Sequence, residues 1–220
     1  SGNTLSLFLN GTRIATTTLS TSFAQNGFSI GSDNGVANSF ADGFFADVRL
    51  VKGTAVYDPT ASTLTVPTAP LTAITNTSLL LNYTNAGIYD ATSKNDLETV
   101  GNAQISTTQS KFGGSSMYFD GTGDYLALQS SAQTQNFEFR TGDFTIEMWV
   151  YRNSSGTYGL AGKGTGTTGW LVSLNSSNQV VFTYGSSTIT STGTISATTW
   201  THIAVVRSGT GANLTKIYIG

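Results

Sequence analysis

The stretch Gly142-Asp-Phe-Thr-Ile-Glu-Met-Trp-Val150 places Phe, Ile, Met and Val on one phase of a two-residue period. Successive side chains of a strand point to opposite faces, so this period predicts a β-strand with one face in a core. The same period recurs along most of the chain, between turns rich in Gly, Asn, Ser and Thr. No stretch has the 3.6-residue period of an amphipathic helix. The sequence therefore predicts an all-β protein of about a dozen antiparallel strands.

Charge and residue usage narrow the class of protein. Only 10% of the 220 residues are charged, and Ser, Thr, Asn and Gly supply the polar surface. Ordinary soluble chains have roughly 25% charged residues, so this composition indicates an extracellular β-protein. The net charge of −2 leaves no basic patch for nucleic acid. No apolar run approaches the ~20 residues of a membrane span, and the absence of cysteine excludes thiolate zinc sites.

All three prolines, Pro59, Pro67 and Pro70, lie between Asp58 and Leu71. Proline cannot donate a hydrogen bond to a neighbouring strand, so this stretch is not predicted to be a central strand. We interpret it as an extended linker of the kind that joins two modules.

The two ends of the chain resemble each other. Alignment of Asn213 with Asn3 places Ile217-Tyr-Ile219 on Leu7-Phe-Leu9, an offset of 213 − 3 = 210 residues. The match predicts that both ends are the same strand from successive copies of a repeat. Because the chain starts directly in a strand-like run, we interpret it as one repeat cut in mid-module.

Three motifs resemble the first half of a laminin G-like, or concanavalin A-like, domain. They are Phe119-Asp-Gly-Thr-Gly-Asp-Tyr-Leu126, the stretch 142–150 and Trp200-Thr-His-Ile-Ala-Val-Val-Arg207. The second half of the family pattern stands at the other end of the chain, in circularly permuted order. It comprises Leu7-Phe-Leu-Asn-Gly11, Phe28-Ser-Ile-Gly31 and Phe44-Phe-Ala-Asp-Val-Arg-Leu-Val-Lys-Gly-Thr-Ala-Val-Tyr57. The resemblance implies a jelly-roll β-sandwich, of the tandem type found in marine phage structural proteins and large bacterial surface proteins.

This order divides the chain into two parts. The resemblance implies that residues 1–70 are the C-terminal half of a laminin G-like repeat with the proline-containing linker, and that residues 71–220 are the N-terminal part of the next repeat. A half-sandwich would expose a broad apolar face and long sheet edges. We therefore expect the parts to pair, either as one permuted sandwich or with neighbouring copies. Only one of the two matching end strands can fill the single position, and the spare strand can pair with another copy.

Catalytic groups are sparse. Glycosidases need two carboxyl groups about 5–5.5 Å or about 6.5–9.5 Å apart. Asp143 and Glu147 are four residues apart on one predicted strand, a separation of about 13 Å. The only histidine, His202, lies in an alternating run and is interpreted as structural. We therefore predict that the chain is not an enzyme.

The segment Asp120-Gly-Thr-Gly-Asp124 is the candidate metal site. Calcium takes roughly six to eight oxygen ligands, and the family resemblance implies a structural Ca²⁺ held by Asp120 and Asp124 with Asp47 from the closing strand. The alternative is that Asp120 and Asp124 make the side-chain hydrogen bonds of Asx-type turns. No other cofactor is predicted.

The predicted function is that of a non-catalytic structural and adhesive module in a repetitive extracellular or virion appendage, such as a fibre, filament or tail protein. Its predicted partners are copies of itself and surface polysaccharide. The alternative is a lectin-type domain that binds a host or environmental polysaccharide. For that alternative, Trp170, Tyr158 and Tyr184 are the candidate aromatic rim, with core packing as the other interpretation. Trp149 and Trp200 are expected in the core.

Overall fold

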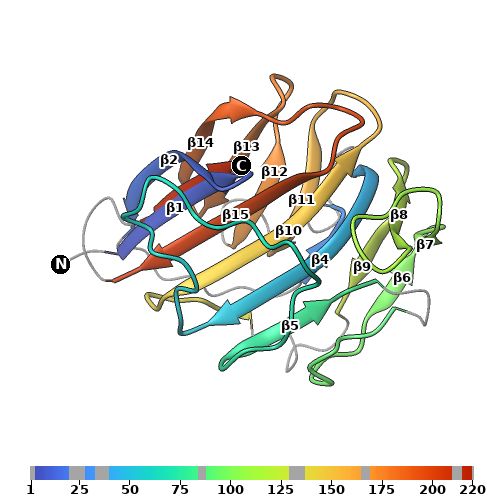
Figure 1. Ribbon diagram of the computed structural model, residues 1–220, viewed down its shortest axis with the longest axis horizontal. Helices are drawn as coiled ribbons and strands as arrows, with labels where there is room; N and C mark the ends of the chain where they lie inside the picture. The colour runs from blue at the N-terminus through green and yellow to red at the C-terminus, as the bar shows by residue number, and fades with distance from the viewer. Residues whose placement is uncertain are drawn as a thin grey trace.

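The computed structural model describes residues 3–19, 28–32, 40–83, 88–128, 137–164, 169–209 and 215–219. In this part of the chain, sixteen strands form two sheets that face each other (Figure 1), and every strand pairing is antiparallel except that of β1 with β16. The predicted all-β, jelly-roll-type sandwich is confirmed, with more strands than the dozen expected. None of the described elements is a helix long and apolar enough to cross a membrane.

The larger sheet is built around β10 (Phe144–Arg152). This strand pairs with β15 (Thr201–Ser208) on one side and with β4 (Asp42–Lys52) on the other. The far edge of β4 is shared by β5 (Thr77–Leu81) and β8 (Ser116–Asp120). The remaining strands of this sheet are β1 (Asn3–Leu9), β2 (Thr12–Leu19), β7 (Gln104–Ser106) and β16 (Thr215–Ile219).

The smaller sheet has the strand order β14-β13-β12-β11-β3-β9-β6. Its strands are β3 (Phe28–Ile30), β6 (Glu98–Val100), β9 (Tyr125–Ala127), β11 (Tyr158–Lys163), β12 (Trp170–Leu174), β13 (Gln179–Tyr184) and β14 (Ser187–Thr194). β3 lies between β11 and β9, just as β4 lies between β10 and β8. Residues 1–70 and 71–220 therefore contribute to both sheets of one sandwich.

The core lies between the two sheets. Phe144, Ile146, Met148 and Val150 on β10 are at most 2% exposed and belong to one apolar cluster that includes side chains of both sheets. Burial of a side chain of this size stabilises the fold by about 1.5–3 kcal/mol. The alternating stretch in the sequence is thus the central strand of the larger sheet.

Residues 53–76, which we call the strap, cross the outer face of the larger sheet. Figure 1 shows them in teal in front of β15 and β10. The Leu64 amide donates to the Gly11 carbonyl at 2.6 Å, and the Val56 amide donates to the Thr145 hydroxyl at 3.1 Å. A second apolar cluster lies beneath the strap and comprises Phe8, Ala204, Val206 and Tyr218 with Ala55, Tyr57 and Leu64. The stretch interpreted as a linker is therefore a packed cover of the sheet.

Candidate functional site

Glu147 is the centre of a buried polar cluster under the strap. Arg49, its register partner on β4, donates from Nε and Nη2 to Oε1 of Glu147 at 2.9 and 2.6 Å. The Tyr57 hydroxyl donates to Oε2 at 2.6 Å, and Nε2 of His202 lies 3.5 Å from the same oxygen. Glu147 and His202 are both 0% exposed. The cluster therefore ties three neighbouring strands and the strap together.

The surroundings of Glu147 keep its carboxyl group ionised. Burial acts to raise the pKa of Glu147, but His202, Arg49 and Tyr57 outweigh this effect and hold the pKa below its ordinary value. Burial and the nearby charge of Glu147 raise the pKa of Tyr57 well above its usual range. A general acid or base must reach the proton that it transfers. An enclosed carboxylate with both oxygens engaged is suited to a structural role.

Asp120 and Asp124 belong to one turn. The Asp124 carboxylate accepts the Asn102 amide on Oδ1 at 2.8 Å and the Asp120 amide on Oδ2 at 2.9 Å. Oδ1 of Asp120 accepts the Thr122 amide at 2.7 Å. Asp124 is fully buried. These contacts are the side-chain-to-backbone hydrogen bonds of the turn interpretation.

The structure places Asp47 apart from this turn. Asp42, not Asp47, lies opposite Asp120 in the pairing of β4 with β8. Asp47 is five residues further along β4, or about 16 Å at ~3.3 Å per residue. Its Oδ1 accepts the Asn82 side-chain amide at 2.5 Å and the Leu71 backbone amide at 3.1 Å. Within the described residues, no three His, Asp or Glu side chains gather in a group that could hold a metal ion. The predicted set of three ligands is therefore corrected.

Substitution of Asp124 by Asn tests the turn directly. We expect a loss of about 1–3 kcal/mol in the free energy of unfolding, because the amide NH₂ would face a buried backbone donor. Urea unfolding should show the same loss with excess Ca²⁺ and with EDTA. Glu98→Gln, at an exposed position on β6, is the control and should be near neutral. A loss that appears only with Ca²⁺ would assign the carboxylate to an ion.

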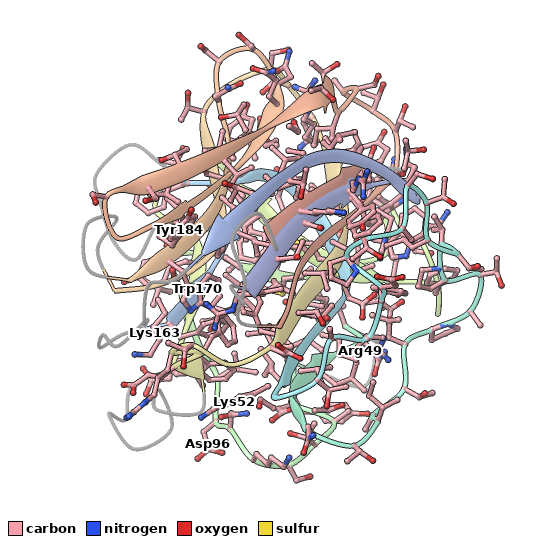
Figure 2. The ribbon with its side chains drawn as sticks, turned by 90° about the vertical axis from the view of Figure 1, so that its left-hand side faces the viewer. Arg49, Lys52, Asp96, Lys163, Trp170 and Tyr184 are labelled. Atoms are coloured by element: carbon pink, nitrogen blue, oxygen red, sulfur yellow. The ribbon has the colours of Figure 1, made fainter. Side chains whose placement is uncertain are left out.

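The three aromatic residues predicted for a glycan rim are core residues. Trp170, Tyr158 and Tyr184 are 1%, 9% and 3% exposed. Trp170 lies opposite Tyr184 in the pairing of β12 with β13, and Figure 2 shows both on the smaller sheet. The Trp170 ring stacks on Phe139 at 5.1 Å, and its Nε1 donates to the Phe137 carbonyl at 3.1 Å. A ring must present an open face to stack on a sugar, so burial corrects this prediction.

A different aromatic group lines a pocket on the outer face of the larger sheet. The pocket has a volume of about 290 Å³ and is bounded by Phe44, Tyr118 and Tyr151. The Phe44 ring lies 4.9 Å from Tyr118 and 5.8 Å from Tyr151, centroid to centroid. Its other lining residues supply hydroxyl and amide groups: Ser106, Thr108, Gln109 and Asn153. The sequence analysis missed this pocket, although Tyr151 lies on the outward phase of β10.

β1 and β16 pair with the same edge of β15 in the same register. Val205 lies opposite both Leu7 and Ile217, and Ala204 lies opposite both Phe8 and Tyr218. The offset in the pairing, 217 − 7 = 210 residues, equals the offset found between the two ends of the sequence. The two end segments are therefore equivalent in structure as well as in sequence.

One comparison with known proteins found a related family. A family model described as the concanavalin A-like lectin/glucanases superfamily matches residues 120–219, just under half of the chain. No curated protein and no solved structure matches the chain. The matched segment runs from the end of β8 through β15 into β16 and contains, apart from Phe119, the three motifs that resemble the first half of the family pattern. Residues 120–219 are therefore similar to the concanavalin A-like lectin/glucanase superfamily, in agreement with the fold of two facing sheets.

Proposed function

We propose that the chain is a non-catalytic structural and adhesive module of a repetitive extracellular or virion appendage. Repetition is the observation that carries this proposal. β1 and β16 are related by 210 residues in sequence and take one register against β15. A tandem array places the same strand at a fixed period along the chain, and a 220-residue segment of such an array contains that strand twice.

The chemistry of the described acidic groups supports a non-catalytic role. Glu147 is enclosed by Arg49, Tyr57 and His202. Asp143, four residues away at the start of β10, accepts the Gly209 amide at 2.7 Å. The separation along the strand is about 13 Å, which suits neither glycosidase geometry.

A lectin-type function is the second candidate, and the aromatic pocket favours it. Glycans are bound by aromatic faces flanked by hydroxyl and amide groups, and the pocket at Phe44, Tyr118 and Tyr151 combines these groups. The lectin branch of the matched superfamily agrees with this candidate. The two functions make different predictions for a single module.

The test compares the chain with a two-copy chain, residues 1–210 followed by residues 1–220. For a structural module we expect an elongated monomer that grows by one sandwich per copy in small-angle scattering, as in other repeat arrays. We also expect no saturable binding on a glycan array and no reducing sugar released from β-glucans. Collapse or aggregation of the two-copy chain would contradict the array.

Saturable glycan binding by the single chain would favour the lectin instead. In that case Tyr151→Ala should weaken binding about tenfold, which corresponds to ~1.4 kcal/mol for one stacked ring. Tyr89→Ala is the matched control, because Tyr89 is 57% exposed and lies outside the pocket. Equal losses in both variants would exclude the pocket as the binding site.

A further inference from the structure

The free edge of β15 offers one position for a strand. A strand in a sheet has two edges, and β10 occupies one edge of β15 along residues 144–150. Both β1 and β16 are paired with the other edge and, in parallel, with each other, and the rings of Phe8 and Tyr218 overlap with parallel planes. Neighbouring strands need about 4.7–4.9 Å between them. The two strands are therefore alternatives and cannot be bound together.

We propose that β1 and β16 are interchangeable occupants of this single slot, and that the strand left out can fill the equivalent slot of a second copy of the chain where that slot is empty. The exclusion of one strand by the other stands on the pairing geometry alone. The second copy as partner rests on the proposed repeat array.

The slot accepts either strand because β1 and β16 present similar side chains to the core on one side of the sheet and to the strap on the other. On the inner wall, Leu7 and Ile217 are both fully buried in the main core. On the outer side, Phe8 and Tyr218 both belong to the apolar cluster under the strap, against which Tyr57 packs. Leucine and isoleucine have equal volume, and tyrosine adds only a hydroxyl to phenylalanine.

The same bend of the strap binds both strands. From β1, the Ser6 hydroxyl donates to the Pro59 carbonyl at 2.8 Å. From β16, the Tyr218 hydroxyl approaches the carbonyls of Asp58 and Ala61 at 3.0 and 2.8 Å. The hydroxyl that Tyr218 has and Phe8 lacks thus finds hydrogen-bond acceptors in the strap. This match would not be expected if β16 lay in the slot by chance.

The identity of the partner follows from the count of strands and slots. A chain with two equivalent strands and one slot always leaves one strand unpaired, and that strand fits the slot of another copy in the same register. The superfamily match passes from β15 directly into β16, which is the strand that follows β15 in the sequence. With a period of 210 residues, that strand is also the opening strand of the next copy. The slot is therefore the joint between successive copies.

Asp substitutions test the exclusion, because a carboxylate in this closed slot prevents docking of the strand that bears it. Phe8→Asp and Tyr218→Asp should each lower the melting temperature by less than about 3 °C, since the other strand fills the slot. The double variant should lose about 10 °C or more. Tyr89→Asp controls for the added charge on an exposed tyrosine. Additive losses, or one single variant as damaged as the double, would overturn the proposal.

Mixing experiments test the exchange with a second copy. The double variant has an empty slot, and the wild-type chain has a spare strand. Light scattering should show a particle of two chains when they are mixed in equal amounts, and single chains when each is alone. Wild type mixed with Tyr89→Asp should remain monomeric. Absence of the mixed particle would overturn pairing with a second copy. Neither readout involves glycan binding or the two-copy chain, so failure of the proposed function is recognised separately.

Discussion

Glu147→Ala is expected to lower the free energy of unfolding by about 3–5 kcal/mol, measured by urea denaturation. The loss comes from Arg49, which is 6% exposed and would be left buried without its negatively charged partner. It also leaves the Tyr57 hydroxyl without its acceptor. Replacement of Arg49 by Met in the Glu147→Ala background should recover part of the loss, because an apolar pair needs no counter-charge.

Glu98→Gln is the control for removal of an exposed glutamate and should change stability by less than about 0.5 kcal/mol. A Glu147→Ala protein as stable as the control would show that the cluster does not stabilise the fold.

Acid unfolding gives an independent check of the role of Glu147. The folded pKa of Glu147 lies below the ordinary value of 4.5. Its contribution to stability is therefore complete above about pH 4.5 and is lost as the pH falls through the folded pKa. The Glu147→Gln variant should lose this part of the acid sensitivity.

Trp170→Ala is expected to cost about 3–5 kcal/mol, as for other fully buried aromatic side chains. The substitution removes the ring stacked on Phe139 and leaves the Phe137 carbonyl without its donor. Trp200→Ala provides the comparison, because Trp200 is half-buried and packs on Tyr151 at 5.6 Å on the outer face. Its loss of stability should be clearly smaller. A Trp170→Ala protein with an unchanged urea midpoint and impaired glycan binding would contradict this expectation. It would support the predicted role of Trp170 in glycan binding.

The sequence predicted strands well where one phase is apolar, as in β10, β4 and β15. It missed strands whose side chains are short and polar. β14 has the sequence Ser-Thr-Ile-Thr-Ser-Thr-Gly-Thr and buries only Ile189 and Ser191. Hydroxyl side chains serve equally in turns and in half-exposed strands, so composition alone does not separate the two. Pairing with β13 decides the structure there.

The candidate sites were harder to predict because they depend on pairing between distant segments. Arg49 and Glu147 are 98 residues apart in the sequence and meet only through the register of β4 with β10. The prolines correctly indicated that the strap is not a central strand, but they carry no information about the surface on which it packs. Trp170 follows a Gly- and Thr-rich segment, and the proximity of a loop was a poor guide to exposure.

The strap has a consequence for how copies of this module can be arranged. Exposed sheet faces and unpaired strand edges are the surfaces through which β-proteins aggregate. Residues 53–76 cover much of the outer face of the larger sheet, including its apolar cluster at Phe8, Ala204 and Tyr218. Under the proposed strand exchange, the strap blocks face-to-face stacking of the larger sheets, and the edge of β15 accepts only one strand. Assembly by this exchange would then extend in one dimension, as a filament rather than as an irregular aggregate.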